Sequence, residues 1–338
     1  MKIVLITGVA GFIGYHLAEK LIEKDIQVVG IDNINDYYDV QLKYDRLHEL
    51  GISQEFASHF NQKVASSKHE ENMIFYRINL EDKLELSELF DEYSFDVVIN
   101  LAAQAGVRYS IENPDAYGQS NLVGFLNILE CCRHHQVKKL LYASSSSIYG
   151  NSSDVPFTTE QAVDHPISLY AATKKANELM AHAYSHLYNI QTIGLRFFTV
   201  YGPWGRPDMA MFLFTKAILN HQPVKVFNHG DLSRDFTYID DIIQGITKIL
   251  EDKQTNETYQ LYNIGNSKPV QLMDFIKEVE KSTGEQAILE MYPMQAGDVN
   301  QTWADVQELK DKFGYNPSYP VDKGVSNFVQ WYRKYYKI

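Results

Sequence analysis

The sequence predicts an α/β fold, a doubly wound parallel sheet with a smaller α/β domain interleaved in the chain. Short apolar runs alternate with stretches of helical periodicity, a glycine-rich turn follows the first run, and the rhythm becomes irregular and proline-rich after Phe198. In the polar stretch 33–72 we expect a helix at 40–50 and a surface linker at 66–72. The expected strands are 3–6, 28–32, 73–80, 97–103, 139–145, 192–198 and 262–265.

The glycine-rich turn TGVAGFIG occupies residues 7–14, directly after the first apolar run. In such a turn Gly8 permits the tight bend, Gly11 lets the backbone approach a diphosphate, and Gly14 lets the following helix pack close to the strand. The N-terminus of that helix offers N–H groups and the positive end of its dipole to the anion. The turn predicts a Rossmann-type dinucleotide-binding domain.

A carboxylate, Asp32, ends the second expected strand about 20 residues farther on, where a dinucleotide-binding fold places an acid on the ribose 2′-hydroxyl. The next residues, Asn33-Ile34-Asn35, include no Arg or Lys that could neutralise a 2′-phosphate, and Asp32 would repel one. This pattern favours NAD over its phosphorylated form. The alternative is a structural glycine turn beside a solvated aspartate.

Composition narrows the class of protein. The formal net charge of −12 disfavours a nucleic-acid or anionic-membrane partner, since such proteins depend on clustered Lys and Arg. No segment has the unbroken apolar length that spans a bilayer. Cys131 and Cys132 are adjacent, which fits neither a disulfide framework nor a CxxC motif. We therefore expect a cytoplasmic protein without a metal, a nucleic-acid partner or a membrane partner.

Two further groups of residues carry chemistry. Tyr170 and Lys174 are four apart on one face of a helix expected after an N-cap at Ser168, and a lysine there can lower the pKa of the phenol. Four serines, 144–147, follow at the carboxyl end of an expected strand, where sites of α/β proteins are built. The alternatives are an exposed Tyr–Lys pair and serines that cap the sheet end.

Together these motifs resemble the extended short-chain dehydrogenase/reductase superfamily and, within it, the NAD-dependent nucleotide-sugar epimerases of the UDP-glucuronate 4-epimerase branch. The resemblance covers nearly the whole chain. It rests on the glycine turn, Asp32, the strand end 101–104, Ser145 with Tyr170 and Lys174, and the segments 104–110, 196–210, 234–236 and 238–241.

The resemblance implies 4-epimerisation of UDP-glucuronate to UDP-galacturonate through a transient 4-keto intermediate. Tyr170 would exchange the proton of the sugar C4 hydroxyl, Lys174 would hold the phenolate, and Ser145 would position the C4 oxygen. NAD would be tightly bound and regenerated in each cycle. Ser146 stands where related dehydratases and decarboxylases carry a carboxylate, so we expect no elimination.

The resemblance also implies the contacts of the two ligands. The expected NAD contacts are Gly8, Gly11, Phe12, Ile13, Gly14, Asp32, Asn79, Leu80, Leu101, Ala102, Ala103, Gln104, Tyr170 and Lys174. The expected UDP-sugar contacts are Arg108, Ser144, Ser145, Ser146, Thr199, Arg206, Arg234 and Asp298. Asn79 departs from the Asp usual in relatives, and Gln295 departs from the Arg that some relatives carry in the segment 295–298.

Arg206 is the candidate partner of the glucuronate carboxylate, because a guanidinium offers two parallel donors. A diphosphate contact or a surface salt bridge is the alternative, and Arg108 is a weaker candidate. Arg234 and Asp298 match positions that hold the diphosphate and the uridine ribose in the family.

The domain boundaries follow from the same pattern. Residues 1–198 are expected to form the NAD-binding domain, with a returning segment at about 233–265. The nucleotide-sugar domain is expected to comprise 199–232 and 266–338.

Three points stay open. The substrate could be a neutral UDP-hexose or UDP-N-acetylhexosamine, and a non-catalytic NAD-binding scaffold or redox sensor is the alternative outside enzymes. A homodimer is expected through the helices 121–134 and 170–188, although their apolar stripes could equally be core.

Overall fold

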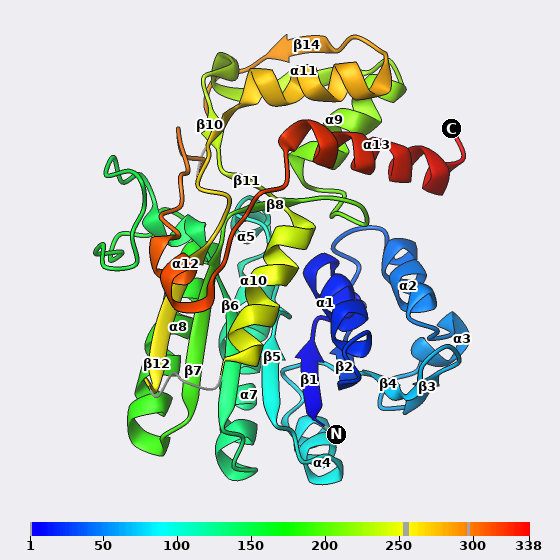
Figure 1. Ribbon diagram of the computed structural model, residues 1–338, viewed down its shortest axis with the longest axis vertical. Coiled ribbons are helices and arrows are strands. Elements are labelled where there is room, and N and C mark those ends of the chain that lie inside the picture. The colour runs from blue at the N-terminus through cyan, green and yellow to red at the C-terminus, as the bar shows by residue number, and fades with distance from the viewer. Residues whose placement is uncertain (1, 253–256, 296–297) are drawn as a thin grey trace. The chain divides into compact units, whose positions relative to one another are not determined.

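The computed structural model describes residues 2–252, 257–295 and 298–338, so Ala296 and Gly297 of the segment 295–298 lie outside the described residues. It has an eight-stranded sheet with the order β12-β7-β6-β5-β1-β2-β4-β3 (Figure 1). Strand β1 pairs in parallel with β2 and β5, β2 with β4, and β5 with β6, whereas β3 is antiparallel to β4. The strands are β1 Ile3–Thr7, β2 Gln27–Asp32, β3 Val64–Ser66, β4 Glu70–Arg77, β5 Val97–Asn100, β6 Lys139–Ser145, β7 Gln191–Phe197 and β12 Tyr259–Ile264.

The chain divides into two compact units. Unit 1 comprises Met1–Ile148, Val163–Arg196 and Lys253–Tyr262. Unit 2 comprises Tyr149–Ala162, Phe197–Asp252 and Asn263–Ile338.

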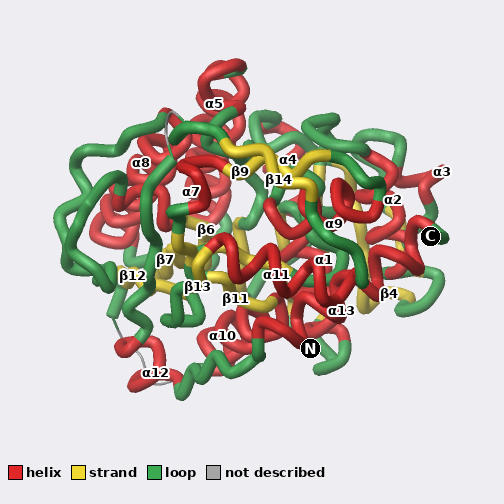
Figure 2. Tube along the Cα trace, turned by 90° about the horizontal axis from the view of Figure 1, so that it is seen from above, coloured by secondary structure: helices red, strands yellow, loops and turns green. Residues whose placement is uncertain are grey.

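Helices cover both faces of the sheet in unit 1. Helix α1 lies on one face, and α4, α7 and α8 lie on the other, as Figures 1 and 2 show. The strand order explains this, because right-handed crossovers from β1 to β2 and from β5 to β6 run in opposite directions. The helices are α1 Phe12–Ile22, α2 Val40–Glu49, α3 Gln54–Ala57, α4 Lys83–Glu92, α5 Tyr109–Glu112, α6 Pro114–Tyr117, α7 Gly124–His134 and α8 Leu169–Tyr188, with a π-helix at Gly118–Val123 and a 3₁₀ turn at Ser146–Tyr149.

The fold expectation is confirmed by the mostly parallel sheet and its flanking helices. The inner strands are apolar on both faces, and Leu5, Val29, Val98 and Leu140 are fully buried. The chain adds strands on one side of β1 up to β4 and on the other side from β5 onward. The order of the strands thus reverses between β1 and β5, and open α/β sheets bind ligands at such a switch point.

One local expectation was wrong, because 66–72 is not a surface linker. Ser66 ends the antiparallel edge strand β3, and β4 begins at Glu70. The Ser66 hydroxyl donates to the Leu50 carbonyl at 2.7 Å and accepts from the Lys68 N–H at 3.0 Å. A polar run therefore forms a hairpin whose serine has a partner 16 residues away. Such a long-range partner leaves no mark in local composition.

In the described part of unit 2 there are three two-stranded sheets. Strand β11 pairs in parallel with β8, and β14 pairs in parallel with β9, whereas β10 and β13 are antiparallel. Among the residues that the structure describes, no helix is both long and apolar enough to cross a membrane. The elements are β8 Thr199–Tyr201, α9 Ala210–Leu219, β9 Pro223–Val226, a 3₁₀ turn at Phe227–Gly230, β10 Ser233–Arg234, β11 Phe236–Tyr238, α10 Ile239–Glu251, β13 Val270–Gln271, α11 Leu272–Thr283, β14 Ile288–Met291, α12 Gln307–Phe313 and α13 Val321–Tyr336.

A buried carboxylate ties distant segments of unit 2 together. Asp235 accepts hydrogen bonds from the backbone N–H groups of Asn266, Ser267 and Ala304 at 2.7, 2.9 and 3.0 Å, and from the Thr237 hydroxyl at 3.1 Å. Burial raises the pKa of Asp235, and these donors oppose that shift. The carboxylate thus holds together residues up to 69 positions apart in the chain.

Candidate active site

The glycine turn has the geometry that its sequence predicts. Gly8 adopts φ +75°, and a Cβ there would lie 2.8 Å from the Ala102 backbone nitrogen. A Cβ at Gly14 would clash with the Gly8 carbonyl oxygen. Because Gly14 has no side chain, α1 can pack closely against the turn. Gly11 precedes α1 and has no side chain with which to cap it. The first N–H groups of α1, including those of Phe12 and Ile13, therefore remain available for an anion, which fits the diphosphate of a dinucleotide.

Asp32 lies at the end of β2, beside this turn. Its Oδ2 accepts the Ala10 N–H at 3.2 Å, and its Oδ1 accepts the Ile34 N–H at 2.8 Å. The carboxylate thereby joins the glycine turn to the loop after β2. Each carboxylate oxygen can accept a further hydrogen bond, as contact with a ribose hydroxyl requires.

The other expected NAD contacts follow neighbouring strands. The chain leaves the sheet after Asn100, so 101–104 form a loop rather than the expected end of a strand. The Thr7 hydroxyl accepts the Ala102 N–H at 3.1 Å, which holds this loop against the end of β1. Leu80 is buried, and its carbonyl accepts from the Asn127 side chain at 2.9 Å. Asn79, Leu101 and Ala103 are partly exposed, whereas Gln104 is buried.

Tyr170 and Lys174 lie together near the N-terminus of α8. The Ser168 hydroxyl accepts the Ala171 N–H at 3.2 Å, so Ser168 caps this helix as its sequence predicts. Lys174 Nζ lies 5.9 Å from the centre of the Tyr170 ring and donates to the Ala143 carbonyl at 3.0 Å. The lysine therefore links the tyrosine to β6, the strand that ends at Ser145.

The buried position of Lys174 predicts a pH dependence. Lys174 is 2% exposed, and burial lowers the pKa of its ammonium from the ordinary 10.5 to about 8. Between these pH values the unfolded chain holds more protons at this residue than the folded chain, so rising pH stabilises the fold. The free energy of unfolding of the wild type, minus that of Lys174→Met, is therefore expected to increase by about 2 kcal/mol between pH 7 and pH 10.

Urea denaturation at each pH measures this difference. Lys175→Met is the matched control, because Lys175 is on the same helix but its side chain is 23% exposed. A difference between wild type and Lys174→Met that stays constant with pH would contradict the buried, charge-sensitive role.

The serines at the end of β6 have different surroundings, because Ser145 and Ser146 lie at the turn whereas Ser144 is buried against α8. The Ser145 hydroxyl donates to the Ser147 hydroxyl at 3.1 Å and accepts the Ser147 N–H at 3.2 Å, and Ser146 is partly exposed in the following turn. Ser144 is buried, and its hydroxyl donates to Glu178 Oε1 at 2.7 Å. This partner does not support the expected substrate contact of Ser144, because side chains alternate between the faces of a strand.

Glu178 and Arg196 form a buried ion pair next to Ser144 and one helical turn from Lys174. Glu178 lies one turn beyond Lys174 on α8, and both side chains of the pair are 1% exposed. Arg196, on β7, donates from Nε and Nη2 to the two carboxylate oxygens at 2.9 Å each. With the Ser144 contact, this bidentate pair joins α8, β6 and β7 at the end of the sheet that carries Ser145.

Asn121, which is not among the expected site residues, holds two segments of the candidate site together. Its Oδ1 accepts the Gln104 N–H at 2.8 Å, and its Nδ2 donates to the Gln104 carbonyl at 3.0 Å and to Thr173 Oγ1 at 3.1 Å. Asn121 thus connects the loop after β5 to α8 beside Lys174. It lies in the π-helix Gly118–Val123, and π-helical turns are frequent at functional sites. Glycines at both ends of this segment were the available signal.

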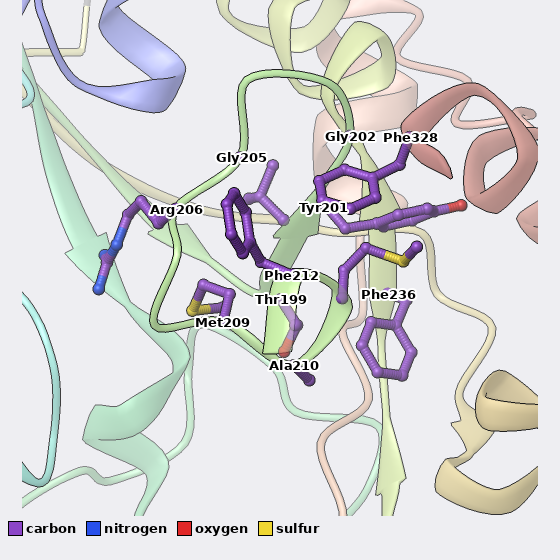
Figure 3. A pocket seen from close by; sticks show the side chains of 12 residues that line it. Thr199, Tyr201, Gly202, Gly205, Arg206, Met209, Ala210, Phe212, Phe236 and Phe328 are labelled. Carbon is purple, nitrogen blue, oxygen red and sulfur yellow. The ribbon is translucent and has the colours of Figure 1, made fainter. Parts of the chain in front are cut away.

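Arg206 has an internal acidic partner in unit 2. Its Nε donates to Asp208 Oδ1 at 3.0 Å, and its Nη2 donates to Oδ2, so both prongs of the guanidinium face one carboxylate. Arg206 borders a small hollow that Thr199, Tyr201, Phe212 and other residues line, and its guanidinium turns away from the aromatic rings (Figure 3). The volume of this hollow, about 10 Å³, suits a single water molecule and not a sugar.

The structure also brings Arg234 and Asp298 together, as ligands to one nucleotide would require. Arg234 Nη2 lies 3.3 Å from Asp298 Oδ1, and Nη1 donates to the carbonyls of Ser233 and Asn300 at 3.0 and 3.2 Å. Arg108, in unit 1, is exposed at the start of α5.

The glycine turn after β1, Asp32 at the end of β2, and the Tyr170–Lys174 pair on α8, held to β6 by Lys174, define a dinucleotide-dependent short-chain dehydrogenase/reductase. Residues 4–265 match the model of the NAD dependent epimerase/dehydratase family, and the chain belongs to this family.

Similar proteins span the whole chain. It is 50% identical over 352 residues to Protein CapI of Staphylococcus aureus, with 100% of both chains covered. It is 44% identical to a probable UDP-glucuronate 4-epimerase of Rhizobium meliloti, with 98% of this chain and 97% of that one covered. The crystal structure of UDP-glucuronic acid 4-epimerase from Bacillus cereus in complex with UDP-glucuronic acid and NAD matches with a TM-score of 0.88 and 32% identity, covering 99% and 100% of the two chains.

Proposed function

We propose that the protein is an NAD-dependent UDP-glucuronate 4-epimerase, which forms UDP-galacturonate through a transient 4-keto intermediate. The observation that carries this proposal is the placement, on one sheet, of the dinucleotide turn after β1 and of the Tyr170–Lys174 pair bound to β6. The Rhizobium meliloti and Bacillus cereus relatives, which are named for this activity, support the substrate.

NAD fits the residues of unit 1. The glycine turn offers N–H groups to the diphosphate, and Asp32 offers acceptors to the ribose. When bound, NAD supplies a reversible hydride acceptor, and we expect it to remain bound through turnover. As part of this proposal, 1–198 with about 233–265 form the NAD-binding domain, and 199–232 with 266–338 form the nucleotide-sugar domain.

Tyr170 is the acid and base of the reaction. As phenolate it takes the proton of the C4 hydroxyl while C4 becomes a ketone, and it returns the proton when C4 is reduced on the opposite face of the sugar. The Lys174 ammonium, 5.9 Å from the centre of the Tyr170 ring, stabilises the phenolate. Ser145 positions the C4 oxygen. Ser146 is a neutral hydroxyl that cannot act as the acid of an elimination, so the reaction ends with epimerisation.

Arg234 and Asp298 bind the diphosphate and the uridine ribose in this proposal, and Thr199 adds a neutral donor. Arg206 binds the glucuronate carboxylate, which has the same bidentate geometry as the Asp208 carboxylate that now faces it.

That same Asp208 contact favours a second candidate, 4-epimerisation of a neutral UDP-hexose or UDP-N-acetylhexosamine. Asp208 already neutralises the Arg206 guanidinium, so a carboxylate on the sugar is not required to balance its charge. The reaction at C4 would be unchanged.

A panel of UDP-sugars decides between the candidates. The purified protein, incubated without added NAD, is expected to convert UDP-glucuronate to its 4-epimer and to convert UDP-glucose at least tenfold more slowly. Separation of the products by liquid chromatography measures this. Faster conversion of UDP-glucose would overturn the substrate proposal, and a pentose with carbon dioxide as the main products would overturn the absence of decarboxylation.

Arg206→Ala tests the carboxylate contact within the same assay. We expect the catalytic efficiency on UDP-glucuronate to fall at least tenfold and the efficiency on UDP-glucose to fall less, because only the former sugar carries a carboxylate for the guanidinium. A charge-assisted hydrogen bond of this kind contributes roughly 1.5–3 kcal/mol. Equal losses on both sugars would assign Arg206 to the diphosphate or to structure.

We also propose a homodimer located in the cytoplasm. Leu126 on α7 and Leu179 and Leu187 on α8 are 40%, 60% and 64% exposed, and exposed apolar side chains on adjacent helices are typical of an interface. Light scattering of the purified protein tests the assembly, since a monomer at every concentration would contradict it.

The proposed location rests on the two cysteines. Free, buried Cys131 and Cys132 are compatible with a reducing compartment.

A further inference from the structure

Helix α2 places a buried arginine against the glycine turn. Arg46 has no exposed surface, although it belongs to a stretch whose polar composition gives no sign of a buried position. Its Nη1 donates to the Ala10 carbonyl at 2.9 Å and to the Tyr38 hydroxyl at 2.7 Å. Ala10 lies within the turn, two residues before α1 begins.

This contact fixes one peptide group of the turn at both ends. The carbonyl oxygen of the Ala10–Gly11 peptide accepts from Arg46, and the N–H of the same peptide donates to the Gly8 carbonyl at 2.9 Å. The N–H of Ala10, which belongs to the preceding peptide, donates to Asp32 Oδ2. The orientation of the peptide directly before α1 therefore depends on Arg46, and this orientation sets the direction of the N–H groups that meet a diphosphate.

A second cation of α2 supports the neighbouring loop. Lys43 is buried three residues before Arg46, and its Nζ donates to both the carbonyl and the side-chain oxygen of Asn35 at 2.7 Å. The Asn35 amide in turn lies 3.4 Å from Gln104 Oε1. Two cations thus approach the loop after Asp32, although no Arg or Lys follows Asp32 directly in the sequence.

The charge of the Arg46 side chain argues against a role in packing alone. A guanidinium stays protonated at all physiological pH values, and burying it carries a desolvation penalty that an aliphatic side chain would avoid. The Tyr38 ring, 5.6 Å from the guanidinium carbon, offsets part of that penalty. A bound diphosphate next to the turn would offset more, because opposite charges attract strongly where water is excluded.

We propose that Arg46 is a positioning residue for NAD, which orients the Ala10–Gly11 peptide of the phosphate-binding turn and adds positive charge beside the diphosphate. The inference rests on the use of NAD in the proposed function and is independent of which sugar is the substrate. Retention of NAD would then depend on a residue of α2 that is not among the NAD contacts expected from the sequence.

The test measures NAD and not turnover. Arg46→Gln keeps a donor but removes the charge, and Arg46→Lys keeps the charge but removes the planar fork. Tyr38→Phe is the matched control, since it removes the other partner of Nη1 and leaves the charge and the aromatic ring. The readouts are the NAD released per chain after gel filtration and denaturation, the Kd of NAD by calorimetry, and the Tm of each protein with and without NAD.

We expect the Kd of NAD to rise at least tenfold in Arg46→Gln, at least threefold in Arg46→Lys, and less than twofold in Tyr38→Phe. The rise in Tm that NAD produces should shrink in the same order. A folded Arg46→Gln that keeps wild-type affinity would overturn the proposal. If Arg46→Gln does not fold, Arg46→Lys decides, and an unchanged Kd there would overturn it. Failure of the proposed substrate would appear separately, as normal NAD retention without epimerisation of UDP-glucuronate.

Discussion

Tyr170→Phe is expected to lower kcat for the epimerisation by about 10²–10⁴-fold, the usual contribution of a general acid–base group. The substitution removes the phenolic oxygen that exchanges the C4 proton. It keeps the ring, whose centre lies 6.1 Å from that of Tyr117 in an edge-to-face contact, so packing is preserved. KM and the amount of bound NAD should change little, because the proton is transferred only as the reaction proceeds.

Steady-state kinetics with quantified NAD content measures this effect. Tyr184→Phe provides the matched control, since Tyr184 lies on the same helix and its hydroxyl donates to Glu130 at 2.6 Å, in a partly buried contact between α8 and α7. We expect that control to keep kcat within twofold of the wild type. A Tyr170→Phe enzyme that retains a tenth or more of wild-type kcat would require another acid–base residue.

Arg196→Met is expected to reduce the free energy of unfolding by about 3–5 kcal/mol, because removal of one member of a buried ion pair leaves the other charge without its closest counter-ion. Glu178 would then keep the Ser144 hydroxyl and the more distant Lys175 ammonium, 3.9 Å away, but lose two charge-assisted hydrogen bonds. The added change Glu178→Gln should recover part of the loss, since it removes the buried charge.

Urea denaturation of the single and double variants gives these values. Lys20→Met serves as the control, because the Lys20–Glu23 pair is exposed and such pairs contribute about 0–1 kcal/mol. A loss below about 1 kcal/mol for Arg196→Met would show that water enters the site and screens Glu178. In that case the pair could not fix α8 against β6 and β7 beside Ser145.

Features that depend on residues close in sequence were predictable. The glycine turn requires one residue without a side chain at each of three nearby positions, and Gly8 and Gly14 show the expected close contacts. Tyr170 and Lys174 share a helix face because they are four residues apart, and Ser168 caps that helix. Local geometry fixes such relations before any tertiary contact forms.

Contacts between distant segments were not predictable. Ser144 remains an expected substrate contact, and its donation to Glu178, 34 residues away, is a partner that no local pattern revealed. Asn121 reaches Gln104 and Thr173 from a π-helix that periodicity does not reveal. Arg206 is the exception, because its partner Asp208 is only two residues away, and the Arg-Pro-Asp order was a usable signal.

The sequence by itself determined the class of fold, the dinucleotide turn, the preference for NAD at Asp32 and the tyrosine–lysine pair. The tertiary structure alone decided which groups hold that machinery in place, among them Arg46 on the turn and the Glu178–Arg196 pair behind Lys174. The physical reason is that a buried polar side chain must find partners wherever the fold places them. Those partners lie up to 36 residues from Arg46 and 34 residues from Glu178, beyond the reach of any local pattern.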